Sequence, residues 1–176
     1  MRPEPVEPDG GHGALFLTAL RKAFAQQKAQ AERVFAQLEP SDWHATLGGE
    51  SNSVAVLARH LAGNLRSRYA DFLTSDGEKP DRDRDGEFTP TSMSPAEILE
   101  EWDAGWETLL ATTAELTPAD LGATVTIRGQ ERLALEALLA TLDHNAQHVG
   151  QIVMLGKNQR GARWDYLTIP PAHRQR

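Results

Sequence analysis

Two histidines, His144 and His148, lie four residues apart in a segment whose apolar residues recur at helical spacing. This spacing places both imidazoles on one face of a helix, one turn apart. Imidazole nitrogen is a frequent metal ligand, and such a pair is typical of transition-metal sites on helices. Two ligands do not make a site, however. The pair is equally compatible with a surface feature or with two hydrogen-bonded buried side chains.

A third histidine, His60, lies in the middle of another helical segment, beside Gly63. A lone histidine there is often a hydrogen-bonded core residue, but in a bundle the facing helices supply inward metal ligands. Three neutral imidazoles with open coordination positions are typical of a catalytic metal site. Such an ion lowers the pKa of a bound water or thiol and acts as a Lewis acid. We therefore predict a metal site formed by His60, His144 and His148.

The predicted cofactor is one divalent metal ion. Imidazole suits zinc, nickel, iron and copper alike, so the ligands do not choose the metal; we take zinc or nickel first, then iron or manganese. The other histidines fall in termini or loops and are left out, although His44 could line the pocket. Three polar residues fall near the histidines by helical phase: Asn64, Arg68 and Gln151. We predict that they support the metal ligands or contact the substrate; the alternative is that they form interhelical hydrogen bonds. No catalytic residue is assigned.

Four segments with helical periodicity must position these side chains. They cover residues 12–38, 53–73, 94–116 and 135–155, the last ending at Gly156. Ser53 or Asn52 is the expected N-cap of the second, and Ser94-Pro95-Ala96-Glu97 forms a capping box at the start of the third. β-Branched residues around 124–127 favour a short strand pair within 123–134. The expected fold is all-α, a four-helix bundle with a short β-hairpin before the last helix.

The expected domain organisation is a flexible N-terminus (1–11), one metal-binding bundle (12–156) and an irregular tail (157–176). The tail is predicted to pack on the bundle through its large apolar residues, Trp164, Tyr166, Leu167 and Ile169. The highly charged stretch 76–87 is expected to be a long loop.

The composition excludes several kinds of site. The 176 residues include no cysteine and six histidines, which excludes disulfides, thiolate zinc sites, iron–sulfur clusters and a cysteine nucleophile. A net charge of -7 argues against nucleic-acid binding. The first residues have the wrong charge for a secretory signal, and the apolar run 14–20 is too short to span a membrane. We expect a soluble cytoplasmic protein with no membrane contact.

Two motifs resemble the DinB-like superfamily, which includes the YfiT-like metal-dependent hydrolases. They are residues 52–64 (NSVAVLARHLAGN) and 143–152 (DHNAQHVGQI), and the resemblance covers residues 15–155. The run 67–79 (SRYADFLTSDGEK) looks like one uncharacterised subgroup. The resemblance implies a four-helix bundle, often a homodimer, with a divalent ion on His60, His144 and His148. It also implies a small-molecule substrate, because characterised relatives include transferases and isomerases that use bacillithiol or mycothiol.

Two functions remain open at this point. The first is a metal-dependent enzyme that activates water or a low-molecular-weight thiol, of hydrolase or thiol S-transferase type. The lack of cysteine means that any thiol must come from a co-substrate. The alternative is a non-catalytic homodimeric metal-binding stress-response protein.

Other motifs are weaker. Residues 81–86 match the start of an EF-hand loop, but the twelfth position is Ser92, so a solvated, internally paired loop is favoured over calcium binding. Arg82 and Arg84 in this loop could instead bind an anionic substrate over the metal. Trp102 and Trp106 are expected in the core. Neither a serine-hydrolase elbow, a P-loop nor a di-iron Glu-x-x-His pair is present.

Overall fold

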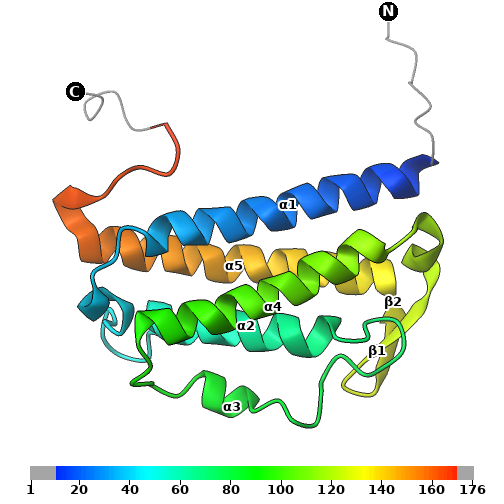
Figure 1. Cartoon of the computed structure of the whole chain (residues 1–176), viewed down its shortest axis with the longest axis horizontal. Helices are drawn as coiled ribbons and strands as arrows, with labels where there is room; N and C mark the ends of the chain where they lie inside the picture. The colour runs from blue at the N-terminus through cyan, green and yellow to red at the C-terminus, as the bar shows by residue number, and fades with distance from the viewer. Residues whose placement is uncertain (1–10, 170–176) are drawn as a thin grey trace, which may run out of the picture.

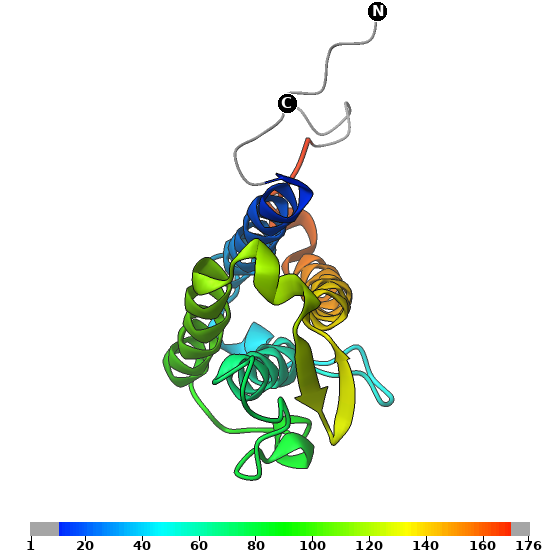
Figure 2. The ribbon, with the colours of Figure 1, turned by 90° about the vertical axis from the view of Figure 1, so that its right-hand side faces the viewer.

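A computed structural model describes residues 11–169, which form a bundle of four long helices (Figures 1 and 2). These are α1 (Gly11–Phe35), α2 (Val54–Tyr69), α4 (Pro95–Glu115) and α5 (Ala134–Arg160). A short α3 (Arg84–Glu87) interrupts the loop between α2 and α4, and 3-10 turns cover Pro40–Trp43, Pro118–Gly122 and Gly161–Arg163. Strands β1 (Thr124–Ile127) and β2 (Gln130–Leu133) precede α5. The predicted all-α fold with a short hairpin is confirmed.

The core lies between the four helices, with α2 packed on α4 and α1 on α5. Trp102 and Trp106 are fully buried with ring centroids 5.3 Å apart, so the prediction that they belong to the core is confirmed. Helices α2 and α4 approach closely at Gly105, where an added Cβ would lie 2.5 Å from the carbonyl oxygen of Ala62. This close approach fixes the position of α2, the helix that carries His60.

The helix starts agree with the sequence better than the helix ends do. Ser53 accepts a hydrogen bond from the backbone N–H of Val56, and Ser94 forms the expected capping box. The expected end of α5 at Gly156 is wrong, because the helix continues to Arg160. An added Cβ on Gly156 would lie 2.3 Å from Val34, so this glycine allows α1 and α5 to pack closely and does not end the helix.

Helices α1 and α2 are shorter than expected. α1 ends at Phe35, three residues before its predicted end, and a turn follows it. The expected continuation of α2 to residue 73 is also wrong. Asp71 has φ 52, and this left-handed backbone conformation cannot continue an α-helix. The chain instead turns towards the hairpin.

The loop that follows α2 is attached to the hairpin. The N–H of Gly77 donates to the carbonyl of Thr126 at 2.8 Å. The Asp76 carboxylate accepts hydrogen bonds from the N–H groups of Arg128 and Gly129, at 2.8 and 2.7 Å. These two residues form the hairpin turn with positive φ, a conformation that glycine adopts readily. The hairpin therefore anchors one end of the loop that crosses the bundle.

The tail packs on the bundle through Trp164, which is buried, and through Tyr166 and Leu167. Ile169 is 87 % exposed, so the expectation that it also packs is wrong. His173 and residues 1–10 lie outside the described residues, and the proposed domain boundaries stay a prediction. Within residues 11–169, no helix has the length and apolar character needed to cross a membrane.

Candidate metal centre

The fold brings together the three histidines selected from the sequence, His60 from α2 and His144 and His148 from α5. One ring nitrogen of each lies within 4.8 Å of those of the other two. The closest contact joins Nε2 of His60 and Nε2 of His144, which are 3.1 Å apart. The His60 side chain is buried and the other two are half-buried. The three histidines therefore lie close enough together to bind one metal ion.

The spacing of the ring nitrogens fits a shared cation. Two nitrogen ligands about 2.1 Å from one ion lie about 3.0 Å apart at a right angle and about 3.4 Å apart at the tetrahedral angle. The 3.1 Å separation of the two Nε2 atoms falls between these values. In two of the three rings, Nδ1 is already engaged by another side chain, so Nε2 remains as the ligating atom.

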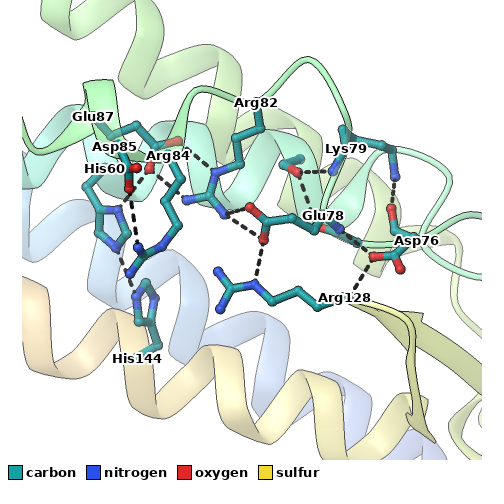
Figure 3. Close-up of polar contacts among 12 residues, drawn as sticks. His60, Asp76, Glu78, Lys79, Arg82, Arg84, Asp85, Glu87, Arg128 and His144 are labelled. Carbon is teal, nitrogen blue, oxygen red and sulfur yellow. Dashed lines mark hydrogen bonds and ion pairs between the residues drawn. The ribbon is translucent and has the colours of Figure 1, made fainter.

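Glu87 engages the second nitrogen of His60. The Nδ1–H of His60 donates to Oε2 of Glu87 at 2.9 Å, and both side chains are buried. Arg82 donates to the same carboxylate from Nε and Nη2, each at 2.7 Å. Arg82 also pairs with Glu78 at 3.3 Å, and Glu78 pairs with Arg128 at 3.1 Å. Figure 3 shows this chain of charged groups running from His60 to the hairpin.

Two neighbours shape the space around His60. Gly63 leaves room for the carboxylate, because an added Cβ would lie 2.1 Å from Oε1 of Glu87. The ring of Phe88 covers His60 with centroids 4.3 Å apart, and the guanidinium of Arg84 lies 5.5 Å from the Phe88 ring. The Gly63–Glu87 contact and the Phe88 ring together hold the His60 ring in one orientation.

The electrostatic environment of His144 and His148 favours the neutral imidazole, which is the form that ligates metals. Burial lowers the pKa of His144 to about 4, and the charges of His148, His60 and Arg68 act in the same direction. Burial also lowers the pKa of His148, although its contact with Gln151 opposes this.

The carboxylate of Glu87 is ionised in this environment. Burial alone would raise the pKa of Glu87, but hydrogen bonds from His60 and Arg82 hold it below its ordinary value. A buried negative charge therefore lies directly behind His60, compensated by the Arg82 guanidinium.

Among the three supporting candidates, Gln151 contacts a histidine directly. Gln151 accepts a hydrogen bond from the Nδ1–H of His148 at 3.0 Å. Asn64 is 4 % exposed, and its Oδ1 has no hydrogen-bond partner among residues 11–169. Arg68 is half-buried, and its buried Nε likewise has no partner in the described part of the chain. Their roles in ligand support or substrate contact remain predictions.

The loop 76–87 is internally paired, as expected, through ion pairs that include Arg82–Glu78 and Arg82–Glu87. The Arg82 side chain is 3 % exposed and engaged by Glu78 and Glu87, so the hypothesis that it binds an anionic substrate is wrong. Arg84 is 48 % exposed, lies 3.8 Å from the Asp85 carboxylate and places its guanidinium over the Phe88 ring. Asp83, in the EF-hand-like run, caps α3 by accepting from the N–H of Gly86 at 2.9 Å.

The two other histidines among residues 11–169 are exposed. His12 is exposed in the first turn of α1. His44 is exposed and lines a cavity of about 300 Å³. This cavity is also lined by Val56, one turn before His60, and by Phe88, which covers the His60 ring. The cavity therefore adjoins the metal centre at the start of α2.

Sequence reasoning missed Glu87. It lies 27 residues from His60, in a loop whose many carboxylates look alike in the sequence. The one available signal was Gly63, because a glycine in the middle of a helix often marks a close approach by another group.

Comparison with known proteins gives a family without an assigned activity. Residues 11–173 match the model of the family described as "Protein of unknown function (DUF1572)". No curated protein matches the chain.

Proposed function

Because the chain belongs to the DUF1572 family, whose description assigns no activity, we propose a function from its histidine centre. His60, His144 and His148 bind one divalent metal ion, and the protein is a metal-dependent enzyme that activates water or a low-molecular-weight thiol. The observation that carries the proposal is the convergence of three ring nitrogens within 4.8 Å, two of them 3.1 Å apart.

The chemistry follows from the ligands. A divalent ion on three neutral imidazoles lowers the pKa of a coordinated water or thiol and polarises an electrophile. The reaction is therefore of hydrolase or thiol S-transferase type. A transferred thiol must be a co-substrate, since the chain contains no cysteine. The resemblance of residues 52–64 and 143–152 to the DinB-like superfamily supports the same proposal.

The surrounding side chains orient the ligands. Glu87 fixes the tautomer of His60 by accepting its Nδ1–H, and Arg82 holds the carboxylate in place with two hydrogen bonds. Gln151 does the same for His148. Burial lowers the pKa of His144 to about 4 and also lowers the pKa of His148, which disfavours protonation of these two imidazoles.

The ion is proposed to be zinc or nickel, with iron or manganese as further candidates. The protein is proposed to act in the cytoplasm, where reduced thiols are maintained. Elemental analysis of the purified protein should give one divalent ion per chain. A screen of small thiols and water against electrophiles should then detect turnover that a chelator abolishes. A protein purified without metal that also fails to take up added zinc or nickel would contradict the proposal.

The second candidate is a non-catalytic homodimeric metal-binding protein of the stress response. Two large apolar side chains on the outer face of α5 favour it, because Leu139 and Met154 are 46 % and 56 % exposed. Sedimentation analysis would detect the dimer, and metal uptake with no turnover in the thiol and water screen would favour this candidate over the enzyme.

A further inference from the structure

Helix α2 presents a row of polar side chains beside the metal centre. His60, Asn64 and Arg68 follow each other at four-residue steps, so they lie on one face of the helix, one turn apart. Arg68 is therefore one turn from Asn64 and two turns from His60, and its Cγ would lie 3.4 Å from an added Cβ on Gly77.

Arg68 differs from the other arginines near the centre in having no acceptor. Arg82 is engaged by Glu78 and Glu87, and Arg128 is engaged by Glu78. Within residues 11–169, Arg68 forms no ion pair, and its buried Nε has no hydrogen-bond partner. A half-buried guanidinium without an acceptor is costly, whereas an oxyanion can accept two hydrogen bonds from it.

The charges around Arg68 are mixed. Burial lowers its pKa, and the charges of Arg82 and Arg128 lower it further, whereas Tyr69 and Glu78 act in the opposite direction. The positive charge of Arg68 acts on His144, so the guanidinium lies within electrostatic range of the metal centre. Asn64 lies one turn from each of His60 and Arg68, and its buried Oδ1, which has no partner among residues 11–169, can accept a hydrogen bond from a donor group of a bound molecule.

We propose that Arg68 binds an anionic group, a carboxylate or a phosphate, of the small molecule that reacts at the histidine centre. The inference rests on the proposed function, because it names the substrate class of the same site. Eight helical residues rise about 12 Å along the axis. The substrate is therefore a small anion whose reactive end lies within about 12 Å of its charged group.

The test uses the chelator-treated full chain, so that an added anion cannot bind to a metal. Acetate and inorganic phosphate are titrated into the wild type, Arg68→Gln and Arg66→Gln, with acetamide as the neutral counterpart of acetate. Arg66 is exposed on another face of α2 and is the matched control. We expect Arg68→Gln to weaken binding of at least one anion about tenfold, the factor for one charged hydrogen bond. Arg66→Gln should bind as the wild type does, and acetamide should not bind.

An NMR titration of the wild type keeps the test valid if Arg68→Gln fails to fold. The Nε–Hε signal of Arg68 should shift with the bound anion, and that of Arg66 should not. The larger effect of acetate or of phosphate identifies the preferred anion. Equal affinity of the wild type and Arg68→Gln for both anions, or an unmoved Arg68 signal, would overturn the inference. Failure of metal uptake would overturn the proposed function instead and is measured separately.

Discussion

A histidine ligand needs its second ring nitrogen held as firmly as the first, and at His60 this depends on one carboxylate. Glu87 lies 2.9 Å from Nδ1, is ionised, and is itself held by Arg82. Its contribution lies in the orientation and basicity of the imidazole, because its Oε2 contacts Nδ1 and not the ring nitrogen that faces His144.

We predict that Glu87→Gln lowers metal affinity about 10- to 100-fold without loss of helical structure. The amide can still accept from Nδ1, but the negative charge and the pair with Arg82 are lost. Competition with a chelating dye measures the affinity, and Asp85→Asn is the control because the Asp85 side chain is 99 % exposed. Equal affinities of the two variants would contradict the role given to Glu87.

His148→Ala removes a ligand without removing packing from the deep core, since His148 is only half-buried. We expect it to abolish stoichiometric metal uptake while the far-ultraviolet circular dichroism stays helical. His44→Ala, at an exposed position outside the centre, should retain full metal content. Unchanged metal content of the His148 variant by elemental analysis would defeat the ligand assignment.

At the scale of secondary-structure elements, the position of His60 depends on how closely α2 packs on α4. Gly105→Ala would place a methyl group 2.5 Å from the Ala62 carbonyl oxygen. We predict a loss of about 1–3 kcal/mol in the free energy of unfolding by overpacking. Gly150→Ala in α5 is the matched control, because nothing lies within 4 Å of its added Cβ.

The control variant Gly150→Ala should instead raise the free energy of unfolding by about 0.5–1 kcal/mol, since alanine favours the helical backbone more than glycine does. Urea unfolding of both variants measures the two effects. If Gly105→Ala proved neutral or stabilising, the contact between α2 and α4 would be looser than the structure shows.

The elements that could be predicted from the sequence are those with local signals. Ser53 and Ser94 mark helix starts because a cap depends on the next few residues. Helix ends depend on distant contacts: Gly156 remains helical because it packs against Val34, far along the chain. The turn at Asp71 likewise could not be predicted, because no glycine or proline occupies this position.

At the scale of the whole molecule, the bundle has a core that does not include the metal centre. Trp102, Trp106 and Phe24 are fully buried and belong to a hydrophobic cluster with residues from all four long helices. We therefore predict that a chelator removes the ion, lowers Tm by the loss of ligand binding, and leaves the helical circular dichroism in place. Unfolding upon chelation would show that the ion has a structural role.

The histidines of the site could be predicted because helical spacing defines which side chains share a face. The pairing of His144 and His148 follows from the geometry of one helix. Adding His60 requires only the assumption that its helix faces the helix of the other two. Glu87, Arg82 and Phe88 could not be predicted in this way. They come from a loop whose path depends on the contact between Asp76 and the hairpin turn, and no periodicity encodes such a contact.

The contact between Gly63 and Glu87 also gives a criterion for comparing other chains of the family. An added Cβ at position 63 would occupy the space of the carboxylate oxygen. Relatives with a larger residue at position 63 should therefore lack an acidic residue at position 87, and the two positions should vary together. A relative that keeps the three histidines but loses this pair should bind its metal more weakly. Such natural variants would rank metal affinity across the family before any mutation is made.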